Sequence, residues 1–168
     1  MKKAILSTAL ATALLGSASA ALAESYVGAD YQMYTFSTSG VDDLEPDALV
    51  FKLGSSLGDY AKLEGRFGRS LSDDNADGVA MKIDEIIGFY VKGGMDVMNM
   101  VFPYAVLGYS KVDFEVRNEP DQTESDMSYG VGADFHFGSM QVGVEWMMMQ
   151  DKTDYELEVI SLSGAWRF

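Results

Sequence analysis

The sequence predicts an all-β protein: an eight-stranded antiparallel up-and-down transmembrane β-barrel, preceded by a cleaved signal peptide. Three observations lead to this fold class. The chain opens with an export-type segment, the rest alternates large apolar residues with small or charged ones, and the connections between the alternating segments are short at every second position.

The N-terminal segment has the layout of a secretory signal peptide. Lys2 and Lys3 precede an apolar stretch over residues 4–15, and small residues end it before Glu24. An uncleaved membrane anchor is the alternative, but the apolar core is short and ends in a cleavage-type site rather than in anchoring charges. We therefore expect a signal peptide over residues 1–23 and one barrel domain over residues 24–168. Loss of Lys2 and Lys3 leaves 10 of the 12 basic residues against 26 acidic ones.

The absence of cysteine excludes several kinds of chemistry. With no cysteine in the chain, disulfides, a thiol nucleophile and thiolate metal sites are all unavailable. After the signal segment, no apolar run approaches the ~18 residues that a membrane-spanning helix needs. A cysteine-free exported chain with strand periodicity must be held together by its sheet.

Strand-type alternation recurs along the whole of residues 24–168. In 129–138, for example, Tyr129, Val131 and Phe135 share one parity, whereas glycine, Asp134 and His136 share the other. The same split continues to the last residue, Phe168, so the chain is expected to end inside a strand. The predicted strands are 25–36, 47–57, 61–70, 79–91, 100–116, 127–137, 140–150 and 157–168.

The connections alternate in character, as in bacterial outer-membrane barrels. Residues 58–60 and 138–140 form tight turns and 92–100 an intermediate one, whereas the other connections are more polar and mostly longer. Short turns at one end with longer loops at the other are typical of such barrels, whose turns are periplasmic. Two strands fit less well: Glu85 falls among apolar residues, and a change of apolar parity in 100–116 predicts a bulge near Ser110 or Lys111.

The two faces of the strands differ in size, and this decides which face points inward. A soluble lipocalin-type barrel would place the large apolar side chains inside, but the interior of eight strands is narrow and suits the glycine-rich face. A base left facing lipid would cost about 2–4 kcal/mol near the midplane. The sequence therefore predicts an interior charge network, formed by Asp30, Lys52, Glu64, Arg66, Lys82, Asp84, Asp134, His136 and Glu145.

Several segments resemble those of a known superfamily. "YVGADYQ", "YAVLGYSKVDF", "SYGVGADFHF" and the closing "SLSGAWRF" are similar to the small outer-membrane β-barrel superfamily that includes the OmpA transmembrane domain, OmpX and the opacity-type adhesins. The resemblance implies a Gram-negative outer-membrane location among lipid and lipopolysaccharide. It also implies that Trp166 and Phe168, in the last strand, form the signal that the barrel-assembly machinery recognises.

The function remains open between two classes. One is a structural or surface-interaction protein with a side-chain-filled interior and acidic extracellular loops that could meet an extracellular ligand. The other is a narrow, porin-like channel for ions or small solutes. We expect no enzymatic activity, because the one histidine, His136, is assigned to the interior and no serine stands in a recognisable relation to it. We also expect no cofactor and no nucleic-acid partner.

One acidic segment has the spacing of a calcium-binding loop. Asp73, Asn75, Asp77 and Asp84 occupy positions 1, 3, 5 and 12 of the EF-hand pattern, with Gly78 at position 6. The flanking helices of an EF-hand are absent from the prediction, and Asp84 also has interior parity. A plain acidic turn is the favoured interpretation, with calcium binding as the alternative.

Overall fold

The computed structural model describes residues 24–38, 46–71, 74–76, 79–116, 122–152 and 155–168. The predicted signal peptide, residues 1–23, lies outside this part, so its cleavage stays a prediction. None of the described residues belongs to a helix long and apolar enough to cross a membrane.

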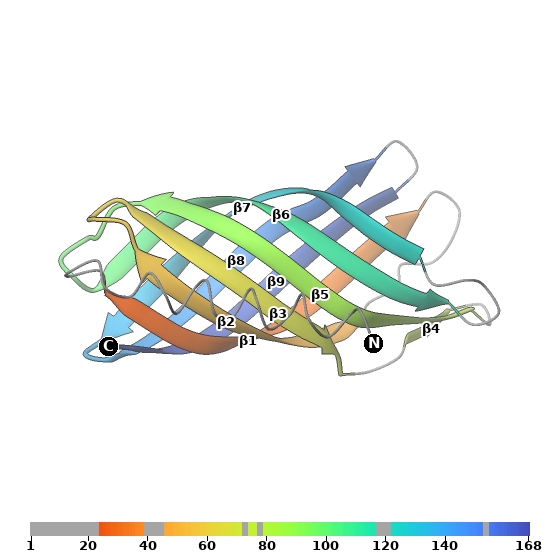
Figure 1. The fold of residues 1–168 in the computed structure, drawn as a ribbon, viewed down its shortest axis with the longest axis horizontal. Helices are drawn as coiled ribbons and strands as arrows, with labels where there is room; N and C mark the ends of the chain where they lie inside the picture. Colours follow the sequence, from red (N-terminus) through yellow and green to blue (C-terminus); the bar gives the residue numbers. More distant parts are fainter. Residues whose placement is uncertain (1–23, 39–45, 72–73, 77–78, 117–121, 153–154) are drawn as a thin grey trace, which may run out of the picture.

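The described residues form nine strands, which run obliquely to the long axis of the molecule (Figure 1). Their bounds are β1 (Ser25–Thr38), β2 (Asp47–Ser56), β3 (Ala61–Ser70), β4 (Asp74–Ala76), β5 (Val79–Gly94), β6 (Val101–Val116), β7 (Gln122–Phe137), β8 (Met140–Lys152) and β9 (Tyr155–Arg167). Each of the eight predicted strands is present, and β4 is an additional short strand that the sequence did not predict.

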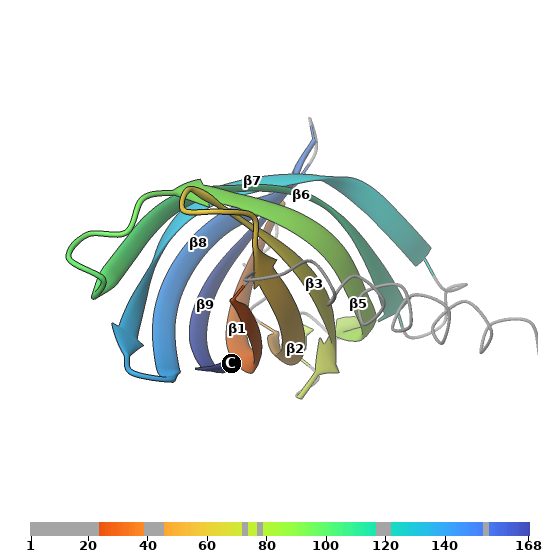
Figure 2. The same ribbon diagram turned by 60° about the vertical axis from the view of Figure 1, so that its left-hand side comes forward.

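Eight of these strands close into a ring, which confirms the predicted fold class. Neighbouring strands pair in antiparallel fashion around the sheet, and the pairing of β3 with β5 completes the circle (Figure 2). The short β4 pairs with the start of β5 and extends that strand as a hairpin. Closure leaves no unpaired edge in the ring, which a sheet in lipid requires.

The last residue lies at the seam between the first and last strands, as the alternation predicts. β9 pairs with β1 from Tyr26 and Arg167 to Thr38 and Tyr155. Beyond these pairs, the backbone N–H of Ser25 donates to the Phe168 carbonyl at 3.0 Å, and the Phe168 N–H donates to the Ser25 carbonyl at 2.9 Å. The terminus is therefore part of the hydrogen-bonded seam.

The two ends of the barrel differ in their connections. The turns β2–β3, β5–β6 and β7–β8 lie together at the left of Figure 1, beside the C-terminus. Gly58 and Gly138 have positive φ of 77° and 63° in two of these turns, a conformation that glycine adopts without strain. Since short turns are periplasmic in such barrels, we call this end the periplasmic end and the opposite one the outer end.

The bulge predicted near Ser110 or Lys111 is wrong. β6 pairs with both of its neighbours without a shift at these positions, and Val112 continues the inward-facing set that includes Ser110. The register shifts instead between Ile83 and Glu85 in β5, and between Met148 and Gln150 in β8. The change of apolar parity in β6 thus marks an apolar interior and not an irregular strand.

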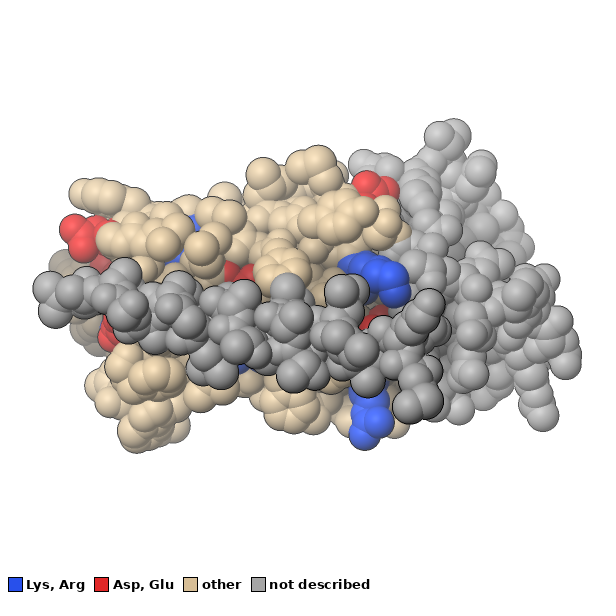
Figure 3. All heavy atoms as spheres, viewed as in Figure 1, with Lys and Arg blue, Asp and Glu red and all other residues tan. Residues whose placement is uncertain are grey.

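The large apolar side chains lie on the outside of the ring. We call this surface the lipid-facing belt. In Figure 3, residues other than Lys, Arg, Asp and Glu cover most of the described surface. Its exposed members include Val27, Phe51, Leu63, Phe67, Phe89, Val91, Leu107, Tyr109, Tyr129, Val131, Val144, Leu162 and Trp166. A soluble barrel with an apolar pocket would have the opposite arrangement.

The narrow interior is filled by tyrosines that lie over glycines. A Cβ added to Gly54 would come within 2.2 Å of the Tyr26 ring, and one added to Gly132 within 2.5 Å of the Tyr104 hydroxyl. Tyr90 lies against Gly88 and Gly108 in the same way. The glycine-rich face was assigned inward because of its size, and these close approaches are the physical reason for it.

Candidate functional site: the barrel interior

Charged side chains occupy the middle of the barrel and its periplasmic half. We call this set the ion layer, and its members are Asp30, Lys52, Lys62, Glu64, Arg66, Lys92, Asp134 and Glu145, each buried. These four bases and four acids balance in charge. Burial of this many charges requires close pairing, since an unpaired charge in a low-dielectric interior is strongly destabilising.

Arg66 lies at the centre of the ion layer. Its Nη1 and Nη2 donate to the two carboxylate oxygens of Glu145 at 2.6 and 2.9 Å, and its Nε donates to Glu64 Oε1 at 2.6 Å. The guanidinium carbon also lies 4.3 Å from the centroid of the Tyr90 ring. A two-pronged contact between arginine and a carboxylate is among the stronger ion pairs that proteins form.

Lys92 connects the same two carboxylates from the other side. Its Nζ lies 3.1 Å from Glu64 Oε2 and 3.7 Å from Glu145 Oε2. The Tyr26 hydroxyl donates to Glu64 at 2.5 Å, and the Tyr104 hydroxyl donates to Glu145 at 2.9 Å. Each carboxylate therefore has an arginine, a lysine and a tyrosine as partners.

Two further ion pairs extend the layer on either side. Lys52 Nζ lies 2.7 Å from Asp30 Oδ1. Lys62 Nζ lies 3.4 Å from Asp134 Oδ2 and 4.1 Å from the centroid of the Phe102 ring. With these pairs, each charged group of the ion layer has an oppositely charged partner.

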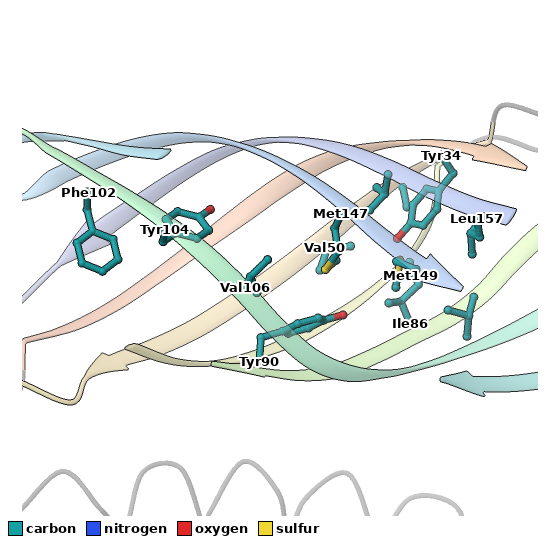
Figure 4. Close-up of a cluster of buried hydrophobic side chains, with 13 residues drawn as sticks. Tyr34, Val50, Ile86, Tyr90, Phe102, Tyr104, Val106, Met147, Met149 and Leu157 are labelled. Carbon is teal, nitrogen blue, oxygen red and sulfur yellow. The ribbon is translucent and has the colours of Figure 1, made fainter. Parts of the chain in front are cut away.

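On the outer side of the ion layer, described side chains form a cluster that is mainly apolar. We call this part the outer apolar layer; it comprises the buried side chains of Tyr34, Ala48, Val50, Ile86, Val112, Met147, Met149, Leu157 and Val159. Figure 4 shows Tyr34, Met147, Met149, Ile86 and Leu157 grouped together, with Phe102 and Tyr104 at the other end of the cluster. Among the described residues, the ion layer is thus followed along the barrel by a mainly apolar layer, beside which Ser70, Ser110 and Ser128 are also buried.

Side chains of both layers lie in the space that the ring encloses. Eight strands enclose a space that side chains can fill, and the ion layer fills it with mutually paired groups.

The predicted network can be compared with these positions residue by residue. Asp30, Lys52, Glu64, Arg66, Asp134 and Glu145 lie in the ion layer. His136 is buried beside them, and its Nδ1 lies 3.4 Å from Asp96 Oδ1 in the β5–β6 turn. The structure describes the backbone of Lys82 and Asp84 within β5 but not their side chains, so their inward placement stays a prediction.

Two lysines of the ion layer were not predicted. Lys62 shares its parity with Glu64 and Arg66, and Lys92 shares its parity with Tyr90, so alternation alone could have identified both. Lys92 was omitted from the predicted interior network because the predicted strand ended at residue 91, whereas β5 continues to Gly94. The sequence analysis also did not predict the outer apolar layer.

The candidate calcium residues are only partly described. Asp73 and Asp77 lie outside the described residues, whereas Asn75 in β4 pairs with Ala80 and Asp84 belongs to β5. Within the described part of the chain, no three acidic or histidine side chains gather in a way that could hold a metal ion. Calcium binding by this segment stays a prediction.

The residues of the predicted assembly signal lie at the periplasmic end of the belt. Trp166 and Phe168 are exposed at the end of β9, and Phe137 is exposed at the end of β7. Aromatic residues at the membrane interface are expected of transmembrane barrels.

A closed antiparallel ring with apolar side chains outside and paired charges inside defines a membrane-spanning β-barrel. The chain belongs to the outer membrane protein β-barrel domain family, whose model matches residues 7–168. The protein is accordingly an outer-membrane protein, as the resemblance of its segments implies. A search among curated proteins finds no match.

Several solved structures have a similar fold. Ail, the attachment invasion locus protein of Yersinia pestis, in complex with a heparin analogue, has a TM-score of 0.64 and 16% identity, covering 87% of this chain and 99% of Ail. Neisserial surface protein A has a TM-score of 0.62 and 18% identity, with coverages of 85% and 95%. The N-terminal barrel domain of Pseudomonas aeruginosa OprF has a TM-score of 0.56 and 11% identity, with coverages of 84% and 97%.

Proposed function

We propose that this protein is a surface-interaction barrel that does not conduct ions and that presents acidic segments to a cationic or cation-bridged partner. The observation that carries the proposal is the two-layered interior. A continuous aqueous path would have to separate the ion pairs around Arg66 and also wet the outer apolar layer. The barrel then acts as a scaffold for the segments at its outer end.

The composition of these segments supports the choice of partner. Over residues 39–47, 71–78, 117–126 and 150–156, the basic residues are Arg117 and Lys152. The acidic residues there are Asp42, Asp43, Glu45, Asp47, Asp73, Asp74, Asp77, Glu119, Asp121, Glu124, Asp126, Asp151, Asp154 and Glu156. A surface with this excess of negative charge attracts cations and repels polyanions.

This excess of negative charge does not suit a ligand of the kind that is bound in the Ail structure. That structure contains sucrose octasulfate, a heparin analogue and thus a polyanion. We infer that a polyanion of this kind does not bind here directly. Anionic lipopolysaccharide could approach through bridging divalent cations, and a basic protein surface could bind without them.

Bilayer recording tests whether the barrel conducts. We expect the refolded wild-type protein to give no steady current, and we expect the same of Arg66→Ala, because the outer apolar layer is intact in that variant. A triple variant, Arg66→Ala/Ile86→Ser/Met147→Ser, changes both layers and should conduct if it folds. A steady, porin-like current from the wild type would overturn the proposal and favour the narrow channel.

Binding measurements test the nature of the partner. Immobilised barrel should bind polylysine, and it should bind lipopolysaccharide vesicles only when calcium or magnesium is present. It should not bind sucrose octasulfate. The variant Asp42→Asn/Asp43→Asn should weaken polylysine binding, and an unchanged affinity would count against the assignment of the acidic segments as the contact surface.

A further inference from the structure

The turn between β5 and β6 has an unusual backbone for its residues. The N–H groups of Met100 and Val101 donate to the Val97 carbonyl at 3.1 and 3.2 Å, which closes a tight turn. Its two central residues, Met98 and Asn99, have positive φ of 57° and 55°. Positive φ at both central positions is the pattern of a type I′ turn, in which glycine, asparagine and aspartate are the favoured residues.

Met98 gains no packing within the molecule that would offset this conformation. Its side chain is 87% exposed at the tip of the turn. A residue other than glycine, asparagine or aspartate at positive φ is strained, and strain of this kind can mark a functional position. An exposed methionine at such a position is explained if the side chain is buried against something outside the chain.

Met98 is part of a larger apolar surface formed by two neighbouring turns. We call this surface the turn patch, and its exposed members are Leu57, Tyr60, Met95, Val97, Met98 and Met100. The Gly94 N–H donates to the Tyr60 carbonyl at 2.8 Å, which holds the β5–β6 turn beside the β2–β3 turn. The carboxylate of Asp96, in the same turn, lies 3.4 Å from His136.

The turn patch continues the lipid-facing belt. Leu63 on β3 and Val91 on β5 are exposed members of the belt, and they lie directly opposite each other in the β3–β5 pairing just above the two turns. On the other side of β6, the neighbouring β7–β8 turn consists of Gly138 and Ser139 only. The longer β5–β6 turn therefore carries its apolar side chains beyond the ends of the strands on the β3–β5–β6 side.

We propose that the turn patch inserts into the periplasmic leaflet and binds the acyl chains of its phospholipids. The continuity with the belt favours lipid over a protein partner, because the same bilayer that covers Leu63 and Val91 lies next to the patch. The exposed polar residues of the two turns, Asp59, Asp96 and Asn99, suit the headgroup region. An uneven lower edge of this kind tilts the barrel or locally thickens the bilayer.

A spin label at residue 98 measures this insertion directly. The chain contains no cysteine, so Met98→Cys carries a single nitroxide label. In vesicles of phosphatidylethanolamine and phosphatidylglycerol, we expect this label to collide more often with oxygen, and less often with a water-soluble nickel chelate, than a label at residue 139 does. A label at Ser139→Cys, in the neighbouring two-residue turn between β7 and β8, is the matched control and should show the aqueous pattern.

Two outcomes would overturn the proposal. One is equal access of the chelate to labels at residues 98 and 139 in correctly folded barrels. The other is a label at residue 98 that is open to the chelate in vesicles and becomes shielded only after a periplasmic extract is added, which would assign the patch to a protein partner. Should Met98→Cys fold poorly, the same measurement with Met95→Cys decides the question.

Discussion

Replacement of Arg66 by alanine should destabilise the barrel more than any exterior substitution on the same strand. The guanidinium has two hydrogen bonds to Glu145 and one to Glu64, and all three side chains are buried. Without it, two buried carboxylates share one nearby ammonium group, that of Lys92. The charge balance of the ion layer changes by one unit in a region that water reaches poorly.

The expected magnitude follows from the partners that remain. Removal of one member of a buried ion pair typically costs about 3–5 kcal/mol. Lys92, Tyr26 and Tyr104 still hydrogen bond or pair with the two carboxylates, so the loss should lie near the lower end, about 3 kcal/mol. Glu145→Gln in the Arg66→Ala background removes the excess negative charge and should recover part of the lost stability. The interaction energy between the two substitutions should be about 1–3 kcal/mol.

Urea unfolding in lipid vesicles, followed by tryptophan fluorescence, measures these free energies. Trp146 adjoins Glu145 in β8 and reports on this region. Arg69→Ala is the matched control, since Arg69 is an exposed arginine on the same strand, and its effect should stay within about 0.5 kcal/mol. Arg66→Met, which preserves most of the volume, separates the lost charge from the cavity.

Two results would refute this account of the ion layer. One is a free energy of unfolding for Arg66→Ala that lies within about 1 kcal/mol of the wild-type value, because removal of one member of a buried ion pair typically costs about 3–5 kcal/mol. The other is strict additivity of Arg66→Ala and Glu145→Gln, which would mean that the two side chains do not interact in the membrane.

Three further substitutions test other parts of the structure. Deletion of Phe168, or Phe168→Ala, should lower the yield of folded barrel far more than substitutions in the outer segments, because this residue completes the seam with Ser25; heat-shift electrophoresis measures the folded fraction. Gly54→Ala should destabilise by about 1–3 kcal/mol through its contact with the Tyr26 ring, and Tyr26→Leu in the same chain should reduce that loss in urea titrations. Calcium binding by residues 73–84 should be millimolar at best, and identical calorimetric titrations of wild type and Asp73→Ala/Asp77→Ala would remove the proposal.

The strands were predictable because one face of the barrel is uniformly apolar. Residues such as Phe51, Leu107 and Val131 alternate with glycine and charge, and a period of two is a strong signal when lipid covers one face. The ends of the strands were less predictable. β7 begins at Gln122, five residues before the predicted start, since polar residues in a strand beyond the membrane carry no such signal.

The partners within the ion layer could not be predicted from alternation. Parity assigns Arg66 and Glu145 to the inside, but these residues lie on β3 and β8, which are not adjacent in the sheet. Their contact depends on the stagger of the strands around the ring, which fixes the height of each residue along the barrel axis. A single strand contains no information about that stagger, so the sequence predicted the members of the network without its pairs.

The outer apolar layer explains both the misplaced bulge and the expectation that Arg66→Ala does not conduct. In the outer part of β6, the inward-facing Val112 is apolar and its neighbours Lys111 and Asp113 are charged, so the apolar parity changes within a regular strand, as it would at a bulge. In β6, Val112 faces inward beside Ile86 and the inward methionines, so the strand is regular and the interior itself is apolar there. With an interior of charges alone, Arg66→Ala would be expected to open a path for ions. Because a second, uncharged barrier lies above the first, loss of Arg66 should weaken the barrel without making it a channel.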